Sequence, residues 1–215
     1  MHIQNLQLII FACFISYLIG SVSGGIIIGK LKNIDIRNHG SKNSGGTNAF
    51  RTMGFFFAIL VLIIDLSKGF VASQYIPYFF NFSDSNILIK TLCGIFSILG
   101  HIYPIFFKFK GGKGVGTALG VLLAIFPYYY SLILFSMWLL SLMISGYVGL
   151  SSIIAGLSLP ITYYIYNIQI DIGELVFVIF IPLLFIFTHC ENIDKLSKGT
   201  ENQFKKIMLF NLFKK

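Results

Sequence analysis

The fold is indicated by the stretch GFFFAILVLIIDLSKGFVASQYIPYF, residues 54–79, in which only Asp65 and Lys68 are charged. A transmembrane helix needs about 20 mostly apolar residues to cross a hydrocarbon core of about 30 Å, and this stretch is long enough. The two charged residues are three positions apart and therefore share one face of a helix. Because isolated charges are costly in hydrocarbon, we expect them to pair or to face the interior of a helix bundle, unless Lys68 extends to an interface.

The composition extends this interpretation to the rest of the chain. Of its 215 residues, 56% are hydrophobic, 16% are aromatic and only 11% are charged. Soluble globular domains carry about 25% charged residues, so the composition excludes that class of protein. We therefore predict an all-α polytopic integral membrane protein with a single transmembrane domain over residues 1–215.

The apolar segments together predict about seven transmembrane helices. The predicted spans are approximately 7–29, 54–79, 86–107, 115–128, 130–146, 149–167 and 173–190. The boundary between the fourth and the fifth is the least defined, because the fourth span is short. No Lys or Arg precedes the first span, so it lacks the basic region of a signal peptide and we expect it to be retained.

The distribution of charge predicts the orientation of these helices. Apart from Lys68 and Lys90, every Lys and Arg lies in one of three short segments, 30–51, 108–113 and 195–215. Basic residues at span ends are typical of cytoplasmic loops, which explains the net charge of +8 better than nucleic-acid binding does. About seven spans with the N-terminus outside place all three segments and the C-terminus in the cytoplasm. An even number would place one basic segment outside, and about five spans is the alternative.

The second of these segments has the composition of a phosphate-binding loop. It contains the run Lys110, Gly111, Gly112, Lys113 and Gly114. Glycine allows consecutive backbone N–H groups to turn toward an anion, and lysine neutralises the negative charge. A helix starting near Val115 would add the positive end of its dipole. The run is not a Walker A loop, because Gly rather than Ser or Thr follows Lys113, and by itself it fits either an anion site or a basic turn.

The first basic segment includes HGSKNSGGTNAFR at 39–51, which combines an arginine with small polar side chains. The planar guanidinium of Arg51 suits bidentate binding of phosphate. The side chains that would complete such a pocket are Ser41, Asn43, Ser44, Thr47 and Asn48. The alternative is a glycine-rich connection whose Ser, Thr and Asn side chains cap helices.

The third basic segment begins where the last predicted span ends. His189 and Asn192 are three positions apart and share a face of one helical turn. A histidine can act as a base near neutral pH, although a lone histidine at a membrane surface is more often structural. We expect Glu201 either to orient a partner or to cap a turn. The three cysteines lack the spacing of a metal site or a disulfide framework, so neither is predicted.

Taken together, the three polar segments resemble the three cytoplasmic motifs of the bacterial membrane-bound acyl-phosphate:glycerol-3-phosphate acyltransferases. In that family the motifs are a Gly-Ser-Gly-Asn-x-Gly-Ala-Thr-Asn-x-x-Arg loop, Gly-His-x-x-Pro followed by Phe-Lys-Gly-Gly-Lys-Gly, and His-x-x-Asn followed by Gly-Thr-Glu. The resemblance covers nearly the whole chain, in the same order. The chain departs from the family pattern at Lys42 and Gly46, at Gly116, where the family has Ala, and at Cys190, where a basic residue is common. None of these changes removes a reacting group.

The resemblance implies an enzyme that needs no metal and no cofactor. Such an enzyme transfers a fatty acyl group from acyl phosphate to the sn-1 hydroxyl of glycerol 3-phosphate, giving 1-acylglycerol 3-phosphate (lysophosphatidic acid) and phosphate. The implied catalytic residues are His189, Asn192, Ser41 and Arg51. The implied phosphate-binding residues are Asn43, Thr47, Asn48, Lys110, Gly111, Gly112, Lys113, Gly114 and Glu201.

The resemblance also implies where the protein acts and with what. It places the protein in the bacterial plasma membrane, with its active site on the cytoplasmic side, at an early step of phospholipid synthesis. The implied partners are the two substrates and membrane lipid, with the soluble enzyme that makes acyl phosphate as a candidate and no nucleic acid.

Two other classes of function stay open at the level of sequence. A transporter or channel for organic anions is expected to carry polar groups or broken helices near the bilayer midplane, where only Asp65 and Lys68 qualify. A non-catalytic membrane scaffold would give no reason for a Lys-Gly-Gly-Lys-Gly run in the same chain as His189 and Asn192.

Overall fold

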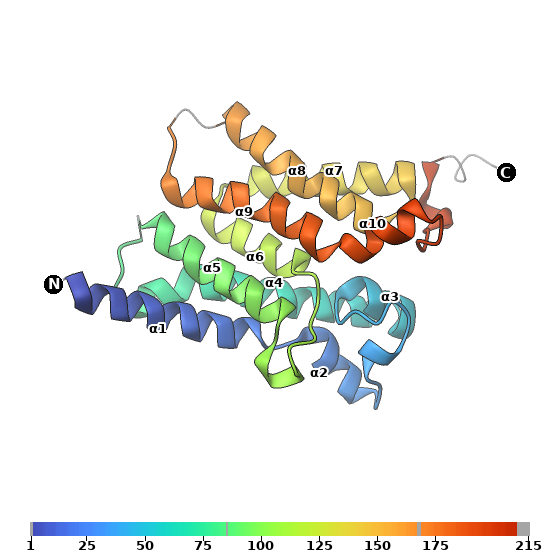
Figure 1. Cartoon of the computed structure of the whole chain (residues 1–215), viewed down its shortest axis with the longest axis horizontal. Coiled ribbons are helices and arrows are strands. Elements are labelled where there is room, and N and C mark those ends of the chain that lie inside the picture. Colours follow the sequence, from blue (N-terminus) through green and yellow to red (C-terminus); the bar gives the residue numbers. More distant parts are fainter. Residues whose placement is uncertain (1, 85, 167–168, 210–215) are drawn as a thin grey trace. The chain divides into compact units, whose positions relative to one another are not determined.

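The computed structural model describes residues 2–84, 86–166 and 169–209, and within these ranges it contains helices and connecting segments but no strand (Figure 1). The prediction of an all-α chain is confirmed. The helices form two compact units, Met1–Phe126 with Asp171–Val176, and Pro127–Ile170 with Phe177–Lys215. A single domain over the full length stays a prediction. The last two lysines of the predicted basic tail, Lys214 and Lys215, lie outside the described residues.

The first unit contains long apolar helices joined by shorter polar elements. Its elements are α1 (His2–Gly20), α2 (Gly24–Leu31), the 3-10 helix η1 (Ile36–Asn38), α3 (Gly46–Met53), α4 (Phe55–Phe79), α5 (Ile87–Ile102), the 3-10 helix η2 (Ile105–Phe107), α6 (Val115–Ile125) and the first residues of α9 (Ile172–Thr188). In this unit α4 packs against α6, and α1 packs against α5.

Small residues allow these helices to approach one another closely. A Cβ atom at Gly20 of α1 would collide with the backbone of Ser97 in α5, and one at Gly120 of α6 would collide with the carbonyl oxygen of Leu66 in α4. Such contacts are typical of membrane helices, whose association depends on close packing rather than on the hydrophobic effect. These glycines therefore set the spacing of the helices that carry the polar loops.

Three ionisable side chains form a buried cluster between α4 and α5. Lys68 Nζ lies 3.0 Å from Oδ1 of Asp65, 2.8 Å from Nδ1 of His101 and 2.7 Å from the carbonyl oxygen of Val22. The side chains of Asp65 and Lys68 are each 4% exposed. The predicted pairing on one helix face is confirmed, and the alternative that Lys68 extends to an interface is wrong. A charge pair with additional hydrogen bonds is tolerated in an apolar interior.

The second unit is built on a helical hairpin. Its elements are α7 (Tyr128–Ser145), α8 (Val148–Tyr166), the remainder of α9, α10 (Cys190–Ser197) and the 3-10 helix η3 (Lys205–Ile207). Gly146 ends α7 with a φ of 75°, a left-handed conformation that glycine adopts without strain, and α8 begins two residues later. The chain bends by 52° between α9 and α10, and α10 packs against α8. The backbone N–H of Phe204 then donates to the carbonyl oxygen of Gly146 at 2.8 Å.

Each predicted span contains a helix, but these helices differ in length. Five helical segments among the described residues are long and apolar enough to cross a membrane: Leu6–Leu31, Phe55–Phe79, Ile87–Phe107, Tyr128–Ser145 and Val148–Tyr166. The bent pair α9 and α10 would count as a sixth span, whereas α6 has 11 residues and is short for a hydrocarbon core of about 30 Å. The first predicted span is broken into α1 and α2 rather than continuous. The count of about seven and the orientation stay predictions.

Candidate functional site

The loop before α3 is shaped by the side chain of Asn48. Its Oδ1 accepts a hydrogen bond from the backbone N–H of Ser41 at 2.8 Å. Its Nδ2 lies within 3.0 Å of the carbonyl oxygens of Ile36, His39 and Asn43. Asn48 is 1% exposed, and the donors and the acceptor of its amide are used inside the loop. The prediction that Asn48 binds phosphate is therefore corrected, because its side chain holds the loop together.

The other polar side chains predicted for this site lie in the same loop and in α3. The hydroxyl groups of Ser41 and Thr47 make no hydrogen bond with another described residue, and both residues are partly exposed. Asn43 accepts the N–H of Gly45 with its Oδ1 at 2.9 Å, which leaves its Nδ2 able to donate. Arg51 extends from the last turn of α3 and is partly buried. The loop therefore separates residues that maintain its shape from residues that can face a substrate.

The glycine-rich segment forms a turn whose first N–H groups are used within the protein. Gly111 donates its N–H to the carbonyl oxygen of Ile102, and Gly112 donates to that of His101, each at 3.1 Å. The prediction that these two N–H groups cradle a phosphate is therefore wrong. Gly114, with a φ of 85°, directly precedes α6. The first N–H groups of a helix lack partners inside the helix, so the start of α6 is the part of this segment suited to an anion.

Two lysines flank this turn. Lys110 is exposed, and its ammonium group makes no hydrogen bond or ion pair with another described residue. Lys113 is partly buried and lies two residues before the start of α6. Both lysines therefore keep the positions that the sequence predicted for them on either side of the glycines.

The buried side of the turn rests on His101. A Cβ atom at Gly112 would collide with Nε2 of the His101 imidazole, so only glycine fits there. His101 is 3% exposed, and its Nδ1 lies 3.4 Å from Oδ1 of Asp65 in the cluster with Lys68. The intramembrane charge cluster thus supports the glycine-rich turn. No role was predicted for His101, although it lies within the Gly-His-x-x-Pro motif.

The side chain of Arg37 joins the first two polar segments. Its Nη1 donates to the carbonyl oxygen of Phe107 at 2.9 Å, and its Nε and Nη2 donate to the two carboxylate oxygens of Asp35 at 3.0 and 2.8 Å. The hydrogen bond from Arg37 lowers the pKa of Asp35, and the same bond raises the pKa of Arg37. Sequence reasoning missed this pair. The pair could have been found from the Asp-x-Arg spacing. An Asp at the start of a helical turn accepts a nearby backbone N–H, and Asp35 caps η1 by accepting the N–H of Arg37.

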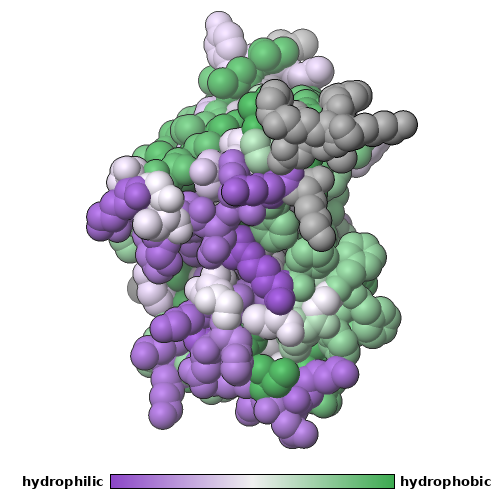
Figure 2. Space-filling view, turned by 90° about the vertical axis from the view of Figure 1, so that its right-hand side faces the viewer, coloured by the Kyte–Doolittle hydropathy of each residue, from purple (hydrophilic) through white to green (hydrophobic). Residues whose placement is uncertain are grey.

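The Arg37 link brings the two segments together at one end of the first unit, where α2 and α3 lie. Figure 2 faces this end, and hydrophilic residues cover much of the surface seen there. Polar loops gathered on one end of apolar helices can bind a charged group at the membrane surface while the helices stay in lipid.

In the second unit, His189 lies between α9 and α10 with a defined ring orientation. Its Nδ1 is 2.8 Å from the carbonyl oxygen of Phe185. A carbonyl oxygen only accepts hydrogen bonds, so Nδ1 carries the hydrogen and Nε2 of the neutral ring carries the lone pair. This tautomer leaves Nε2 able to accept a proton, as a general base must.

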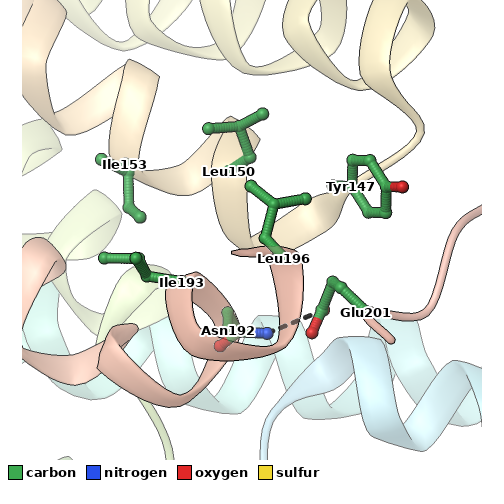
Figure 3. Close-up of a pocket in the computed structure, with 7 residues that line it drawn as sticks. All are labelled: Tyr147, Leu150, Ile153, Asn192, Ile193, Leu196 and Glu201. Atoms are coloured by element: carbon green, nitrogen blue, oxygen red, sulfur yellow. Dashed lines mark hydrogen bonds between the residues drawn. The ribbon is translucent and has the colours of Figure 1, made fainter. Parts of the chain in front are cut away.

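The two other predicted residues of this unit form a hydrogen bond with each other. Nδ2 of Asn192 donates to Oε1 of Glu201 at 2.8 Å (Figure 3). This hydrogen bond supports the expectation that Glu201 orients a partner, which stays a prediction, as does its implied binding of phosphate. Tyr147 and Leu150 of α8 and its preceding turn line a pocket beside this pair, and its volume is about 20 Å³. A cavity of this size holds about one water molecule and is too small for a substrate.

Comparison with known proteins gives consistent results. The chain matches the model of a protein family over residues 10–199, and that family is described as glycerol-3-phosphate acyltransferase. The glycerol-3-phosphate acyltransferase of Aquifex aeolicus is 42% identical over 203 residues, which cover 94% of this chain and 100% of that protein. The glycerol-3-phosphate acyltransferase of Fusobacterium nucleatum subsp. nucleatum is 41% identical over 199 residues, which cover 91% and 98%.

Solved structures show the same relationship. The fold is similar to a crystal structure of PlsY, an integral membrane glycerol 3-phosphate acyltransferase, in its glycerol 3-phosphate form. The TM-score is 0.83 at 38% identity, and the match covers 96% of this chain and 99% of that chain. A crystal structure of PlsY in its lysophosphatidic acid form gives a TM-score of 0.81 at 38% identity, with 91% and 95% covered.

Proposed function

Because this chain belongs to the glycerol-3-phosphate acyltransferase family and is an integral membrane acyltransferase, we propose that it transfers a fatty acyl group from acyl phosphate to the sn-1 hydroxyl of glycerol 3-phosphate. The products are 1-acylglycerol 3-phosphate and inorganic phosphate. The observation that carries this proposal is the similarity, over nearly the whole chain, to an enzyme solved in a glycerol 3-phosphate form and in a lysophosphatidic acid form. The choice of donor is supported by the resemblance of the three polar segments to the motifs of the acyl-phosphate-dependent enzymes.

The proposed reaction needs no covalent enzyme intermediate. The sn-1 hydroxyl oxygen attacks the acyl carbonyl carbon, and the bond from that carbon to the phosphate oxygen breaks. Phosphate leaves with the electron pair, and the hydroxyl proton passes to a base. Because the donor is already activated by its phosphate, the chain does not need a Gly-x-Ser-x-Gly nucleophile elbow.

The main requirement is to hold two anions close together. Donor and acceptor each carry a phosphate and repel one another unless cations and N–H groups compensate their charge. Orientation of two reactants can contribute roughly 7–11 kcal/mol in good intramolecular cases, whereas a general base contributes about 10²–10⁴-fold in rate. We therefore assign most of the rate enhancement to binding and positioning.

In this proposal phosphate is bound by side chains of the glycine-rich turn, of the loop before α3 and of α3 itself. Arg51 supplies a guanidinium fork, and Lys110 and Lys113 supply ammonium groups beside the start of α6. Ser41 and Asn43 donate further hydrogen bonds from the loop before α3, and Thr47 donates one from the first turn of α3. Gly111, Gly112 and Gly114 shape the turn that carries the lysines, and Asn48 maintains the loop.

The hydroxyl proton has two possible acceptors. The tautomer of His189 presents Nε2 as a base, and Asn192, oriented by Glu201, supplies a polar group from the same unit. Alternatively, a phosphate oxygen of a substrate accepts the proton, and His189 only binds substrate. The two mechanisms predict different effects of replacing His189.

The location of the reaction is part of the proposal. We place the protein in the bacterial plasma membrane with the polar loops in the cytoplasm, because basic residues concentrate in those loops. There the acyl chain can stay between helices while its phosphate remains at the aqueous surface. Acyl phosphate would be supplied by a soluble enzyme that makes it.

Purified protein tests the proposed reaction directly. Given palmitoyl phosphate and glycerol 3-phosphate, it should release inorganic phosphate and form 1-palmitoylglycerol 3-phosphate. Palmitoyl-CoA in place of palmitoyl phosphate is the matched control and should give no product. Absence of phosphate release in every lipid composition would overturn the proposed donor, whereas product from palmitoyl-CoA alone would identify a different one.

A transport function is distinguished by a separate measurement. Counterflow of labelled glycerol 3-phosphate in liposomes should be absent if the protein is only an acyltransferase. Labelled glycerol 3-phosphate that accumulates in the vesicles without acylation would instead support the transporter.

A further inference from the structure

A hollow of about 440 Å³ opens beside α2 and η2, and it involves none of the residues assigned to acyl transfer. Its volume lies within the roughly 300–1,000 Å³ typical of ligand pockets. The polar residues of its lining are Lys30, Asn33, Asp35, Arg37 and Lys108. We propose that this hollow is a second anion site, which binds a phosphate group at the membrane surface.

The charges that line the hollow are not balanced. Arg37 and Asp35 form an ion pair and neutralise each other. Lys108 is exposed, and its ammonium group makes no hydrogen bond or ion pair with another described residue. Lys30 Nζ lies 5.7 Å from the ring centroid of Phe107, a cation–π contact that leaves its N–H groups able to donate. Two uncompensated cations in one hollow attract an anion.

The wall that carries Lys108 is held in place by the rest of the unit. Arg37 Nη1 donates to the carbonyl oxygen of Phe107 at 2.9 Å and lies 3.5 Å from that of Lys110, so the chain is tied on both sides of Lys108. Lys108 has a φ of 58°, a left-handed conformation that is unfavourable for an ordinary residue. The surrounding contacts therefore fix this position, and a preformed site loses less conformational freedom on binding.

Exposed apolar side chains border the cations and indicate where the phosphate comes from. Phe106 lines the hollow and is 59% exposed, and Leu31, next to Lys30, is 75% exposed. Figure 2 shows hydrophobic surface next to hydrophilic surface at this end of the unit. A phospholipid presents a phosphate beside its acyl chains, and lysines near a membrane surface are attracted to anionic headgroups. The observations therefore favour a lipid headgroup over a free phosphate.

The chain offers a closely matched control for a test of this site. Lys30 stands over a phenyl ring, and Lys108 is in the left-handed conformation. Outside the hollow, Lys32 likewise stands 4.7 Å from the ring centroid of Phe57, and Lys42 has a φ of 59°. The double variants Lys30→Gln/Lys108→Gln and Lys32→Gln/Lys42→Gln therefore remove the same charge and the same kinds of interaction.

The experiment measures binding of dioleoyl phosphatidate to the full-length protein in detergent by native mass spectrometry. Phosphatidylcholine with the same chains is the zwitterionic comparison, and inorganic phosphate is added as a competitor. The Lys30→Gln/Lys108→Gln variant should bind phosphatidate at least about tenfold more weakly, because it removes two charged hydrogen-bond donors. The Lys32→Gln/Lys42→Gln variant should bind it as the wild type does.

Every result of this experiment bears on the proposal. If only the Lys30→Gln/Lys108→Gln variant loses phosphatidate, and inorganic phosphate does not displace phosphatidate from the wild type, the site binds a lipid headgroup. If inorganic phosphate displaces phosphatidate from the wild type, the site is one for free phosphate. Equal loss in both double variants, or no phosphatidate binding by the wild type, overturns the site. An Arg51→Ala variant should keep phosphatidate bound. Loss in that variant would show that the lipid occupies the acyl-transfer site instead.

Discussion

Ser41, in the loop before α3, and Asn48, in the first turn of α3, are polar residues with different roles. The amide of Asn48 is buried and used within the loop, whereas the hydroxyl of Ser41 has no partner among the described residues. Residue type left open whether these side chains bind phosphate or cap helices, because Ser and Asn side chains bond either to nearby backbone or to a ligand. The family resemblance implied a functional role for both. Only the partner of each atom, which depends on the folded loop, separates the two roles.

This difference predicts that one substitution lowers stability and the other lowers turnover. Asn48→Asp should destabilise the protein, because it removes both donors of the amide and places a negative charge beside the carbonyl oxygens of Ile36, His39 and Asn43. Such an unsatisfied buried group costs about 1–3 kcal/mol, and more when it is charged. Ser41→Ala should lower turnover and leave the unfolding temperature unchanged. Thermal unfolding and phosphate release of both variants check this, and equal stability would contradict the structural role of Asn48.

At His189 the tautomer leads to a kinetic prediction. If Nε2 takes the hydroxyl proton, His189→Ala should lower turnover by about 10²–10⁴-fold, and added imidazole should restore part of the rate. Cys190→Ser, at the exposed neighbouring position, is the control and should keep full activity. Phosphate release under saturating substrates is the measurement. Full activity of His189→Ala would exclude the base role and leave a substrate phosphate as the proton acceptor.

At the scale of elements, the sequence motif of the glycine-rich turn predicted where the next helix begins but not the hydrogen bonds of the turn. The sequence predicted a turn followed by a helix near Val115, and α6 begins there. It also predicted free N–H groups at Gly111 and Gly112, which instead donate to the end of α5. These hydrogen bonds depend on tertiary structure, because the carbonyl oxygens of His101 and Ile102 come close to the turn only when α5 and the turn pack together. The same dependence explains why the roles of Arg37 and His101 were missed.

Substitutions at two glycines test the contact between this turn and His101. Gly112→Ala should drive Cβ into the imidazole of His101, and overpacking of this kind costs about 1–3 kcal/mol. Because the turn carries Lys110 and Lys113, we also expect a raised KM for glycerol 3-phosphate. Gly116→Ala is the control, since its Cβ would lie 3.4 Å from Cβ of Asp65, an ordinary contact. Thermal unfolding and steady-state kinetics check the pair, and a neutral Gly112→Ala would contradict the contact with His101.

At the scale of the whole molecule, hydropathy predicted the fold class and the approximate position of every long helix. The described residues form helices and connecting segments, the chain is an integral membrane protein of the expected family, and hydropathy and motif order were sufficient for that result. The short fourth span was predicted, and α6 has 11 residues. The break between α1 and α2 was not predicted, because it occurs inside an apolar stretch, where hydropathy does not distinguish one continuous helix from two packed pieces.

Orientation across the membrane is tested by labelling single cysteines in a Cys190→Ser background. Cys13 and Cys93 are buried and should stay unreactive. A cysteine at Lys42 should react with a membrane-impermeant maleimide only in inverted vesicles, because basic loops are retained in the cytoplasm. A cysteine at Asp84, an exposed position before α5, should react only from the opposite side. Reaction of both positions from one side would contradict the predicted sidedness.

The ion pair of α4 has a consequence for how the protein is made. Asp65 and Lys68 lie on the same helix, so their pairing requires no other segment of the chain. On insertion scales each unpaired charge at a helix centre disfavours integration by about 2.5–3.5 kcal/mol. α4 is also the most apolar of the five span-length helices. It can therefore leave the translocon as a nearly neutral segment before α5 is synthesised, and His101 then reaches a polar partner that is already in the membrane.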